Sequence, residues 1–232
     1  MKKFLWFYLV FLLFFLSPSH PTFLGVPKTG GESSDTQENR FVSDLRTFQK
    51  QIDSDKAFAG LFAPDVFAYP VVLQPQNAHA FVSSRPDELT YFALAEKFGS
   101  VGLLAHNTLA GKDFFSLKAG DEVGYYQRGV WQWYRVEQIL QFQALTPESP
   151  TSDFRDLEHP ERVLSASALF QEIYAQPGKL ILQTCVARGQ IDSWGRLFIV
   201  AAPISSTETK FDALQIFSAN PSSLLEAVPT PR

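Results

Sequence analysis

The chain has 232 residues, of which 45% are hydrophobic and 14% aromatic, and its formal net charge is −4. This length allows one domain with a sizeable core, together with a leader and a long loop. Charged residues make up only 19% of the chain and show no clustered excess of Lys and Arg, which argues against nucleic acid as a partner. An acidic chain is also a poor candidate for simple adsorption to anionic lipid.

The N-terminus begins MKKFLWFYLVFLLFFLSPSHPTF, in which two lysines precede an apolar run from Phe4 to Leu16. A helix of this length spans about 20 Å, short of the ~30 Å hydrocarbon core of a bilayer. The pattern is typical of a secretory signal, with Ser17 and Ser19 near a cleavage site, or of an uncleaved N-terminal membrane anchor. A buried core helix is the alternative that the two lysines disfavour. We therefore predict a signal peptide or anchor over residues 1–24, and a protein body outside the cytoplasm.

A polar stretch rich in Gly, Ser and Pro follows, and it predicts a flexible linker over residues 25–39. Apolar residues then recur at the spacing of one helix face: Phe41, Leu45, Phe48 and Ile52. They predict an amphipathic helix over 38–53. A second helix is predicted over 85–98, with Ser84 as N-cap, Pro86 in the first turn and Gly99 at the end.

Strands are predicted between and after these helices. Residues 65–75 read as a strand in which Pro70 favours an edge position. Residues 100–107, SVGLLAHN, read as a short buried strand that ends at His106. Residues 121–145 carry aromatic and β-branched residues on both sides of a QRG turn, which is typical of a hairpin.

The last third of the domain begins with an acidic, proline-rich loop over 146–160 and a predicted helix over 161–174. Pro177 and Gly178 close this helix, and two apolar strands, KLILQTC and RLFIVAAP, complete the domain. Several strands with short inserted helices and no βαβ alternation indicate a mostly antiparallel β-barrel or sandwich.

Cys185, the single cysteine, ends the strand KLILQTC, so no internal disulfide is possible. A free cysteine is often a packed, inert hydrophobe, and this is one interpretation. The other is a nucleophile, because strand ends present functional groups and a nearby cation favours the thiolate. Arg196, which opens RLFIVAAP, and Arg188 are the two candidate cations.

A thiolate that attacks a carbonyl also needs a proton donor for the leaving group, most often a histidine. His20 lies in the leader, His79 in a turn and His159 in the proline-rich loop. Only His106 ends an apolar strand, which is the kind of position that Cys185 occupies. A structural or surface histidine is the alternative.

The strand LILQTC resembles the signature strand of sortases, Thr-Leu-x-Thr-Cys, and its last four residues match Leu-x-Thr-Cys position by position. Arg196 stands where sortases place their arginine, at the start of the strand after the cysteine. Residues 103–126, LLAHNTLAGKDFFSLKAGDEVGYY, resemble the sortase block in which a strand ends in the histidine. In that sortase block the histidine is followed by an FF-x-L element and by a strand that starts with GD-x-V, as in FFSL and GDEV of this chain. The likeness spans roughly residues 99–203.

The resemblance implies a mostly β fold, an eight-stranded closed barrel with a few short helices, preceded by the hydrophobic leader. It implies that the Cys185 thiolate attacks a peptide carbonyl, that Arg196 holds the oxyanion and that His106 protonates the leaving amine. The backbone around Thr184 would add donors, which makes Thr184 a substrate-binding residue. We expect His106, Cys185 and Arg196 to converge within about 4–8 Å at one end of a groove.

The implied reaction is transpeptidation at a bacterial cell surface or membrane. The acyl donor would be the sorting-signal peptide of an exported protein, and the acceptor an amine of a cell-wall precursor or a pilin lysine. Two alternatives stay open. One is a sortase-like cysteine endopeptidase that mainly hydrolyses; the other is a sortase-fold envelope scaffold or binding module without activity. We assign residues 40–210 to the catalytic domain and 211–232 to a C-terminal extension.

The sequence departs from the family pattern in three places. Ala105 replaces the usual glycine before the histidine, and residues 65–84 match the first part of the barrel poorly. Residues 146–176 form a long segment with a predicted helix, which resembles the insertion of class B sortases. Because this region helps to form the substrate groove in the family, the recognised peptide sequence stays open.

Two groups of side chains allow a second interpretation. Aromatic residues either line a peptide groove or belong to the core: Trp131, Trp133 and Trp194. Acidic residues of the proline-rich loop lack the regular spacing of a calcium site: Glu148, Asp153 and Asp156. We expect a solvated loop, and neither a metal nor another cofactor.

Overall fold

The structure is a computed structural model, and it describes residues 34–149 and 151–205. The predicted leader over 1–24 and the predicted C-terminal extension over 211–232 lie outside these residues. Within the described part of the chain, no helix is both long and apolar enough to cross a membrane.

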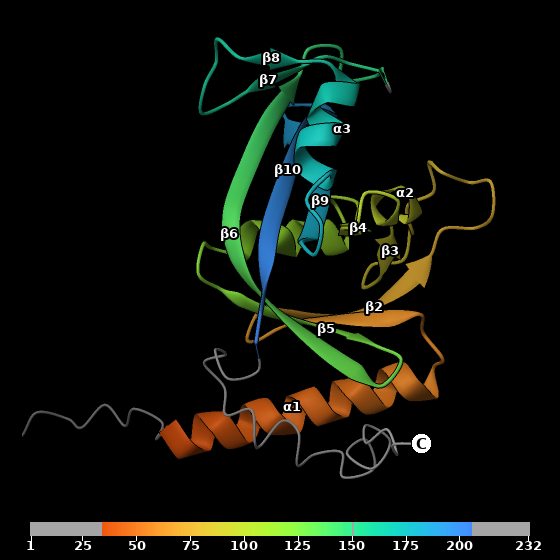
Figure 1. Cartoon of the computed structure of the whole chain (residues 1–232), viewed down its shortest axis with the longest axis vertical. Coiled ribbons are helices and arrows are strands. Elements are labelled where there is room, and N and C mark those ends of the chain that lie inside the picture. Colours follow the sequence, from red (N-terminus) through yellow and green to blue (C-terminus); the bar gives the residue numbers. More distant parts are fainter. Residues whose placement is uncertain (1–33, 150, 206–232) are drawn as a thin grey trace, which may run out of the picture. The chain divides into compact units, whose positions relative to one another are not determined.

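Eight strands form a closed barrel, which confirms the predicted fold class. Around the barrel they are β10 (Ile191–Ile204), β9 (Leu180–Arg188), β4 (Val101–Leu104), β3 (Leu89–Tyr91), β2 (Phe67–Leu73), β1 (Ala59–Ala63), β5 (Glu122–Gln127) and β6 (Val130–Ala144). The pairing of β6 with β10 closes the circle (Figure 1). All neighbours are antiparallel except β2 with β3 and β4 with β9. The predicted hairpin over 121–145 is β5 and β6, joined by Arg128 and Gly129 at positive φ.

Two further short strands extend the sheet at the C-terminal end of β6. β7 (Phe154–Asp156) pairs with β6, and β8 (Val163–Leu164) pairs with β7. α3 (Ala166–Tyr174) follows, with the Ser165 hydroxyl accepting a hydrogen bond from the Ala168 N–H as N-cap. The predicted helix over 161–174 therefore starts later than expected, and the predicted loop over 146–160 contains a strand. β7 and β8 lie beside α3 at one end of the long β6 and β10 strands (Figure 1).

Side chains alternate between the two faces of the barrel wall, and this alternation separates two cores. Inward-facing residues of all eight strands fill the barrel; those of β9 and β10 are Leu180, Leu182, Leu197, Ile199 and Ala201. The residues between them face outward and pack with α3 in a second core, which contains Ile181, Phe198 and Val200. The position of a residue along β9 or β10 thus determines the face on which its side chain lies.

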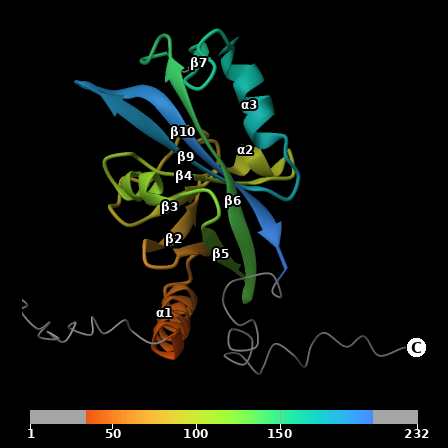
Figure 2. The ribbon, with the colours of Figure 1, turned by 90° about the vertical axis from the view of Figure 1, so that its left-hand side faces the viewer.

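α1 (Ser34–Ser54) confirms the predicted amphipathic helix, although it begins earlier and includes residues 34–39 of the predicted linker. Its apolar face packs on the barrel in a third core with Phe62, Tyr126 and Trp133. Polar contacts flank this core, because Trp131 Nε1 donates to Gln49 and the Tyr126 hydroxyl donates to Asp53. Trp133 is therefore a core residue, and the half-buried Trp131 packs against this core. Figure 2 shows α1 at the end of the barrel that lies away from α3.

The predicted helix over 85–98 is wrong in its first half. Residues 89–91 form β3, which pairs with β2 on one side and β4 on the other, and α2 (Ala93–Glu96) is only one turn long. The predicted stop is in place, since Gly99 has a φ of +81° after this turn.

Pro70 does not mark an edge strand, because β2 lies between β1 and β3. Pro70 pairs with Gly60 of β1, but β3 pairs with β2 only from Val71 onward. The proline therefore sits at the last position before β3 joins, where one side of β2 has no strand partner. A missing N–H is tolerated at such a local edge.

Candidate active site

Cys185 and Arg196 are direct cross-strand partners in the antiparallel β9–β10 pair. Residues directly opposite each other share one face of the sheet, with Cβ atoms about 4.5–5.5 Å apart. Cys185 continues the outward alternation of Ile181, and Arg196 that of Phe198, so both side chains lie on the outer face of the barrel. Both are half-buried. The thiol is therefore not sealed in the interior.

His106 lies beyond the end of β4, which runs parallel to β9 on the side away from β10. Leu104 pairs with Gln183, and the Ala105 N–H donates to the Gln183 carbonyl at 3.1 Å. His106 is thus two residues past Leu104, just as Cys185 is two residues past Gln183. The imidazole is exposed. The predicted strand limits are wrong here: β9 continues past Cys185 to Arg188 and β10 begins at Ile191, because the two strands stay paired toward their turn. The register places His106, just beyond β4, level with Cys185 of β9 and with Arg196 opposite it on β10.

The chain turns sharply after His106 and enters η1, a 3₁₀ helix (Ala110–Ser116). The His106 carbonyl accepts hydrogen bonds from the N–H groups of Leu109 and Gly111, both at 3.0 Å. A Cβ on Gly111 would lie 2.3 Å from Thr184 Oγ1 and 2.8 Å from the His106 carbonyl oxygen. Only glycine lets η1 approach this closely. The turn therefore fixes the main chain of His106 against β9.

Thr184 has its side chain in the barrel interior, where it is 2% exposed and its hydroxyl donates to the Ala105 carbonyl at 2.9 Å. This contact ties β9 to the residue before His106. The side chain faces away from the surface that carries Cys185, so a substrate contact at this position would come from the main chain.

Arg196 is held by its own strand and by the β6–β7 extension. Its Nη1 donates to the carbonyls of Ser193 at 3.0 Å and Gly195 at 2.8 Å, and its guanidinium carbon lies 5.8 Å from the centre of the Phe154 ring. No carboxylate of residues 34–149 or 151–205 forms an ion pair with Arg196. A permanently charged group placed in this way keeps donors for an anionic ligand.

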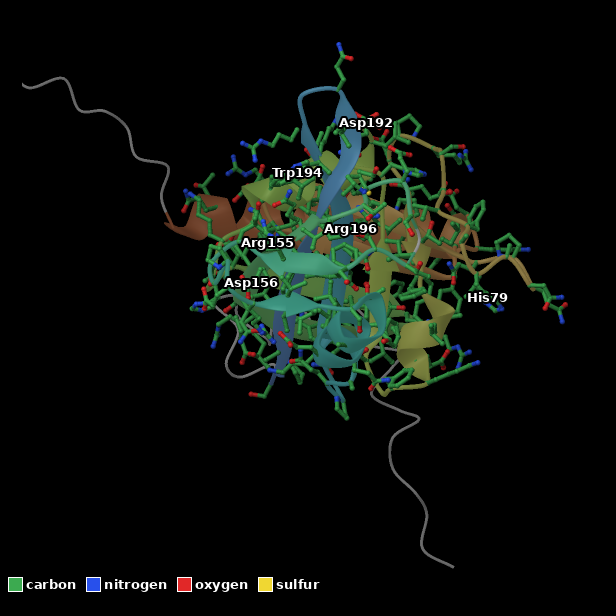
Figure 3. The ribbon with its side chains drawn as sticks, turned by 90° about the horizontal axis from the view of Figure 1, so that it is seen from above. His79, Arg155, Asp156, Asp192, Trp194 and Arg196 are labelled. Carbon is green, nitrogen blue, oxygen red and sulfur yellow. The ribbon has the colours of Figure 1, made fainter. Side chains whose placement is uncertain are left out.

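Arg188, the rival cation, is exposed near the tip of the β9–β10 hairpin and stacks on Trp194, with its guanidinium carbon 4.9 Å from the ring centre. Figure 3 shows Asp192, Trp194 and Arg196 along β10, with Asp192 nearest the tip of the hairpin. The Asn107 amide donates to the Asp192 carbonyl at 3.2 Å, so the loop after His106 is also tied to this hairpin. Arg196, and not Arg188, is the register partner of Cys185.

The other histidines do not join this group. His79 is exposed in the loop after β2 and lies well apart from Arg196 in Figure 3. His159 is exposed, and its main-chain N–H donates to the Asp156 carboxylate. His20 lies outside the described residues.

The solved structures with a similar fold include sortases. Sortase C1 from Streptococcus suis has 16% sequence identity to this chain and a TM-score of 0.45. The aligned region covers 75% of this chain and 87% of the Streptococcus suis chain. Sortase E1 from Streptomyces coelicolor, with a tripeptide in the active site, has 18% sequence identity and a TM-score of 0.42. The aligned region covers 68% of this chain and 96% of the Streptomyces coelicolor chain. No protein-family model and no curated protein matches the sequence.

Asp156 of β7 lies in line with the candidate site across the sheet. It pairs with Phe142 of β6, and Phe142 pairs with Arg196 of β10. Burial alone would raise the pKa of Asp156, but the N–H groups of Glu158 and His159 and the Arg162 guanidinium together hold that pKa below its ordinary value. Asp156 is therefore a structural carboxylate of the β7–β8 turn. No cluster of three or more metal-binding side chains occurs among the residues that the structure describes.

Sequence reasoning missed Gln183, two residues before Cys185, and its hydrogen-bond partner Tyr174. Gln183 occupies the unspecified position of the Leu-x-Thr-Cys pattern and faces outward like Cys185. Its Oε1 accepts a hydrogen bond from the Tyr174 hydroxyl of α3 at 2.6 Å. A polar residue among the apolar residues of KLILQTC was the available signal, but its partner on α3 could not be read from the pattern.

Proposed function

We propose that this protein is an extracytoplasmic cysteine transpeptidase of the sortase type. The observation that carries the proposal is the pairing of Cys185 with Arg196 on the outer face of the barrel, one strand away from the end of β4 that leads to His106. A nucleophile, a permanent cation and a proton carrier at one site form the set that acyl transfer through a thioester needs.

The first half-reaction consumes a peptide bond. The Cys185 thiolate adds to the carbonyl carbon, and the Arg196 guanidinium stabilises the oxygen that becomes negative. His106, as imidazolium, gives its proton to the leaving nitrogen, the C–N bond breaks, and a thioester remains on Cys185. In the second half-reaction an acceptor amine attacks the thioester, His106 takes the proton, and the thiolate leaves.

The proposed acyl donor is the sorting-signal peptide of an exported protein, and the proposed acceptor is an amine of a cell-wall precursor or a pilin lysine. The segment 146–176, which contains β7, β8 and α3, would form one wall of the peptide site, as the insertion of class B sortases does. The predicted leader would hold the enzyme at the bacterial cell membrane or direct its secretion.

The test uses a library of fluorophore-labelled pentapeptides with triglycine as the acceptor amine. We expect wild type to convert a subset of peptides into triglycine adducts, and Cys185→Ala to be inert while keeping the fold. Thermal denaturation checks that the variant is folded. Free acids as the sole products would indicate the hydrolytic endopeptidase, and an inert wild type would indicate the scaffold.

A further inference from the structure

The outer face of β9 carries one polar side chain next to the thiol. Gln183 lies two residues before Cys185 on the same face, and its partners on the flanking strands are Leu104 of β4 and Phe198 of β10. Leu104 is 8% exposed and Phe198 3% exposed, so an amide stands between two buried apolar side chains. Such a position favours an aliphatic residue unless the amide forms a hydrogen bond within the protein or to a ligand.

Tyr174 supplies one partner and thereby fixes the amide. Its hydroxyl donates to Gln183 Oε1 at 2.6 Å, and burial raises the pKa of Tyr174 so far that it remains a donor at any ordinary pH. A phenol that always donates holds the oxygen end of the amide toward α3. The Nε2 end then points away from α3.

The Nε2 group of Gln183 forms no hydrogen bond with residues 34–149 or 151–205, and it is not one of the buried unsatisfied atoms of this part of the chain. Gln183 as a whole is half-buried, and this nitrogen is not fully sealed from solvent. The amide nitrogen is therefore left as a donor on the outer face of β9, two residues before Cys185.

The spacing suits an extended peptide. Residues two apart on one strand are about 6.6 Å apart, which is also the distance between alternate residues of an extended ligand. We propose that Gln183 is a specificity-determining residue that donates a hydrogen bond to a main-chain carbonyl of the acyl-donor peptide, two residues from the scissile bond. This inference rests on the proposed function. It defines the substrate class as peptides that bind extended, with the amide at that position intact.

The first experiment measures kcat and KM of Gln183→Met and of the matched control Gln143→Met. The probe is the best-converted pentapeptide of the library, with triglycine as the acceptor. Gln143 is a half-buried glutamine of β6 whose register partner is Gly195, so it lies on the face opposite to Arg196. We expect Gln183→Met to raise KM about tenfold with kcat changed much less, because one hydrogen bond to the bound peptide is lost. Gln143→Met should leave KM unchanged.

The second experiment replaces the backbone amides of the same peptide, one at a time, by esters, whose carbonyls are weaker acceptors. One ester should raise KM for wild type but not for Gln183→Met, and Tyr174→Phe should lose part of this discrimination. Equal KM values for the two Met variants in an active enzyme overturn this inference alone. An inert wild type overturns the proposed function together with it.

Discussion

Arg196 is the direct cross-strand partner of Cys185 in the antiparallel β9–β10 pair, and it forms no ion pair with any carboxylate of residues 34–149 and 151–205. Its Nη1 is held by two backbone carbonyls, which orient the guanidinium without neutralising its charge. An oriented cation on the same face of the sheet as the thiol, one strand away, is suited to an anionic transition state.

Arg196→Ala should lower kcat for peptide cleavage by about 10²–10³-fold, the loss measured when one oxyanion donor is removed. Arg196→Lys should recover only part of it, because an ammonium lacks the planar fork of donors. Arg188→Ala is the matched control, since Arg188 stacks on Trp194 at the hairpin. Steady-state kinetics of peptide cleavage give kcat for each variant and show which arginine the reaction depends on. A larger loss in Arg188→Ala than in Arg196→Ala would show that the wrong arginine has been assigned.

Gly111→Ala should disturb the turn that holds His106. The new Cβ would come within 2.3 Å of Thr184 Oγ1, so we expect a loss of about 1–3 kcal/mol in the free energy of unfolding, and reduced turnover in the folded fraction. The double variant Gly111→Ala/Thr184→Ala removes that hydroxyl. Denaturant unfolding of both single variants and the double variant should show a loss smaller than the sum. Additive losses would mean that the contact between Gly111 and Thr184 does not hold the turn.

Phe48→Ala tests whether α1 belongs to the folded domain. Phe48 is 4% exposed, and its ring lies 5.9 Å from that of Phe62 and 6.4 Å from that of Trp131. Truncation should cost about 3–5 kcal/mol in the free energy of unfolding. Lys50→Ala, on the exposed face of the same helix, should stay within about 0.5 kcal/mol of wild type. A Phe48→Ala protein as stable as Lys50→Ala would show that α1 does not pack on the barrel.

Asp156 should make the stability of the β7–β8 turn depend on pH. Its pKa in the folded protein lies below the ordinary 3.8, so its stabilising effect is complete above that value and is lost as the pH falls through the folded pKa. The difference in unfolding free energy between wild type and Asp156→Asn should therefore be largest near about pH 7 and shrink toward about pH 2. A difference that grows on acidification would contradict the assignment of Asp156 as a charged, hydrogen-bonded carboxylate.

The sequence predicts those elements whose partners are close along the chain. β5 and β6 are joined by a two-residue turn, and β9 and β10 are consecutive, so local alternation and turn residues suffice for both pairs. The segment 85–98 shows the opposite case. Leu89, Thr90 and Tyr91 become a strand because β2 and β4 lie on either side of them, and no local helical signal reports such partners.

The same distinction applies to the site. The ends of two apolar strands pointed to Cys185 and His106, and the position of Arg196 came from the family resemblance. The pairing of β4 with β9, which brings the residues just after β4 beside Cys185, joins segments about 80 residues apart and follows from the barrel topology. The Tyr174–Gln183 hydrogen bond depends on how α3 docks, which the sequence pattern does not contain.

Trapping the acyl-enzyme is the most direct check on the proposed chemistry. Wild type would be mixed with the best-converted pentapeptide in the absence of triglycine, quenched in acid, and digested for peptide mapping by mass spectrometry. We predict that the N-terminal fragment of the peptide is attached to Cys185, is released by hydroxylamine, and does not accumulate once triglycine is added. Cleavage without any adduct, or an adduct that persists in Cys185→Ala, would contradict the account.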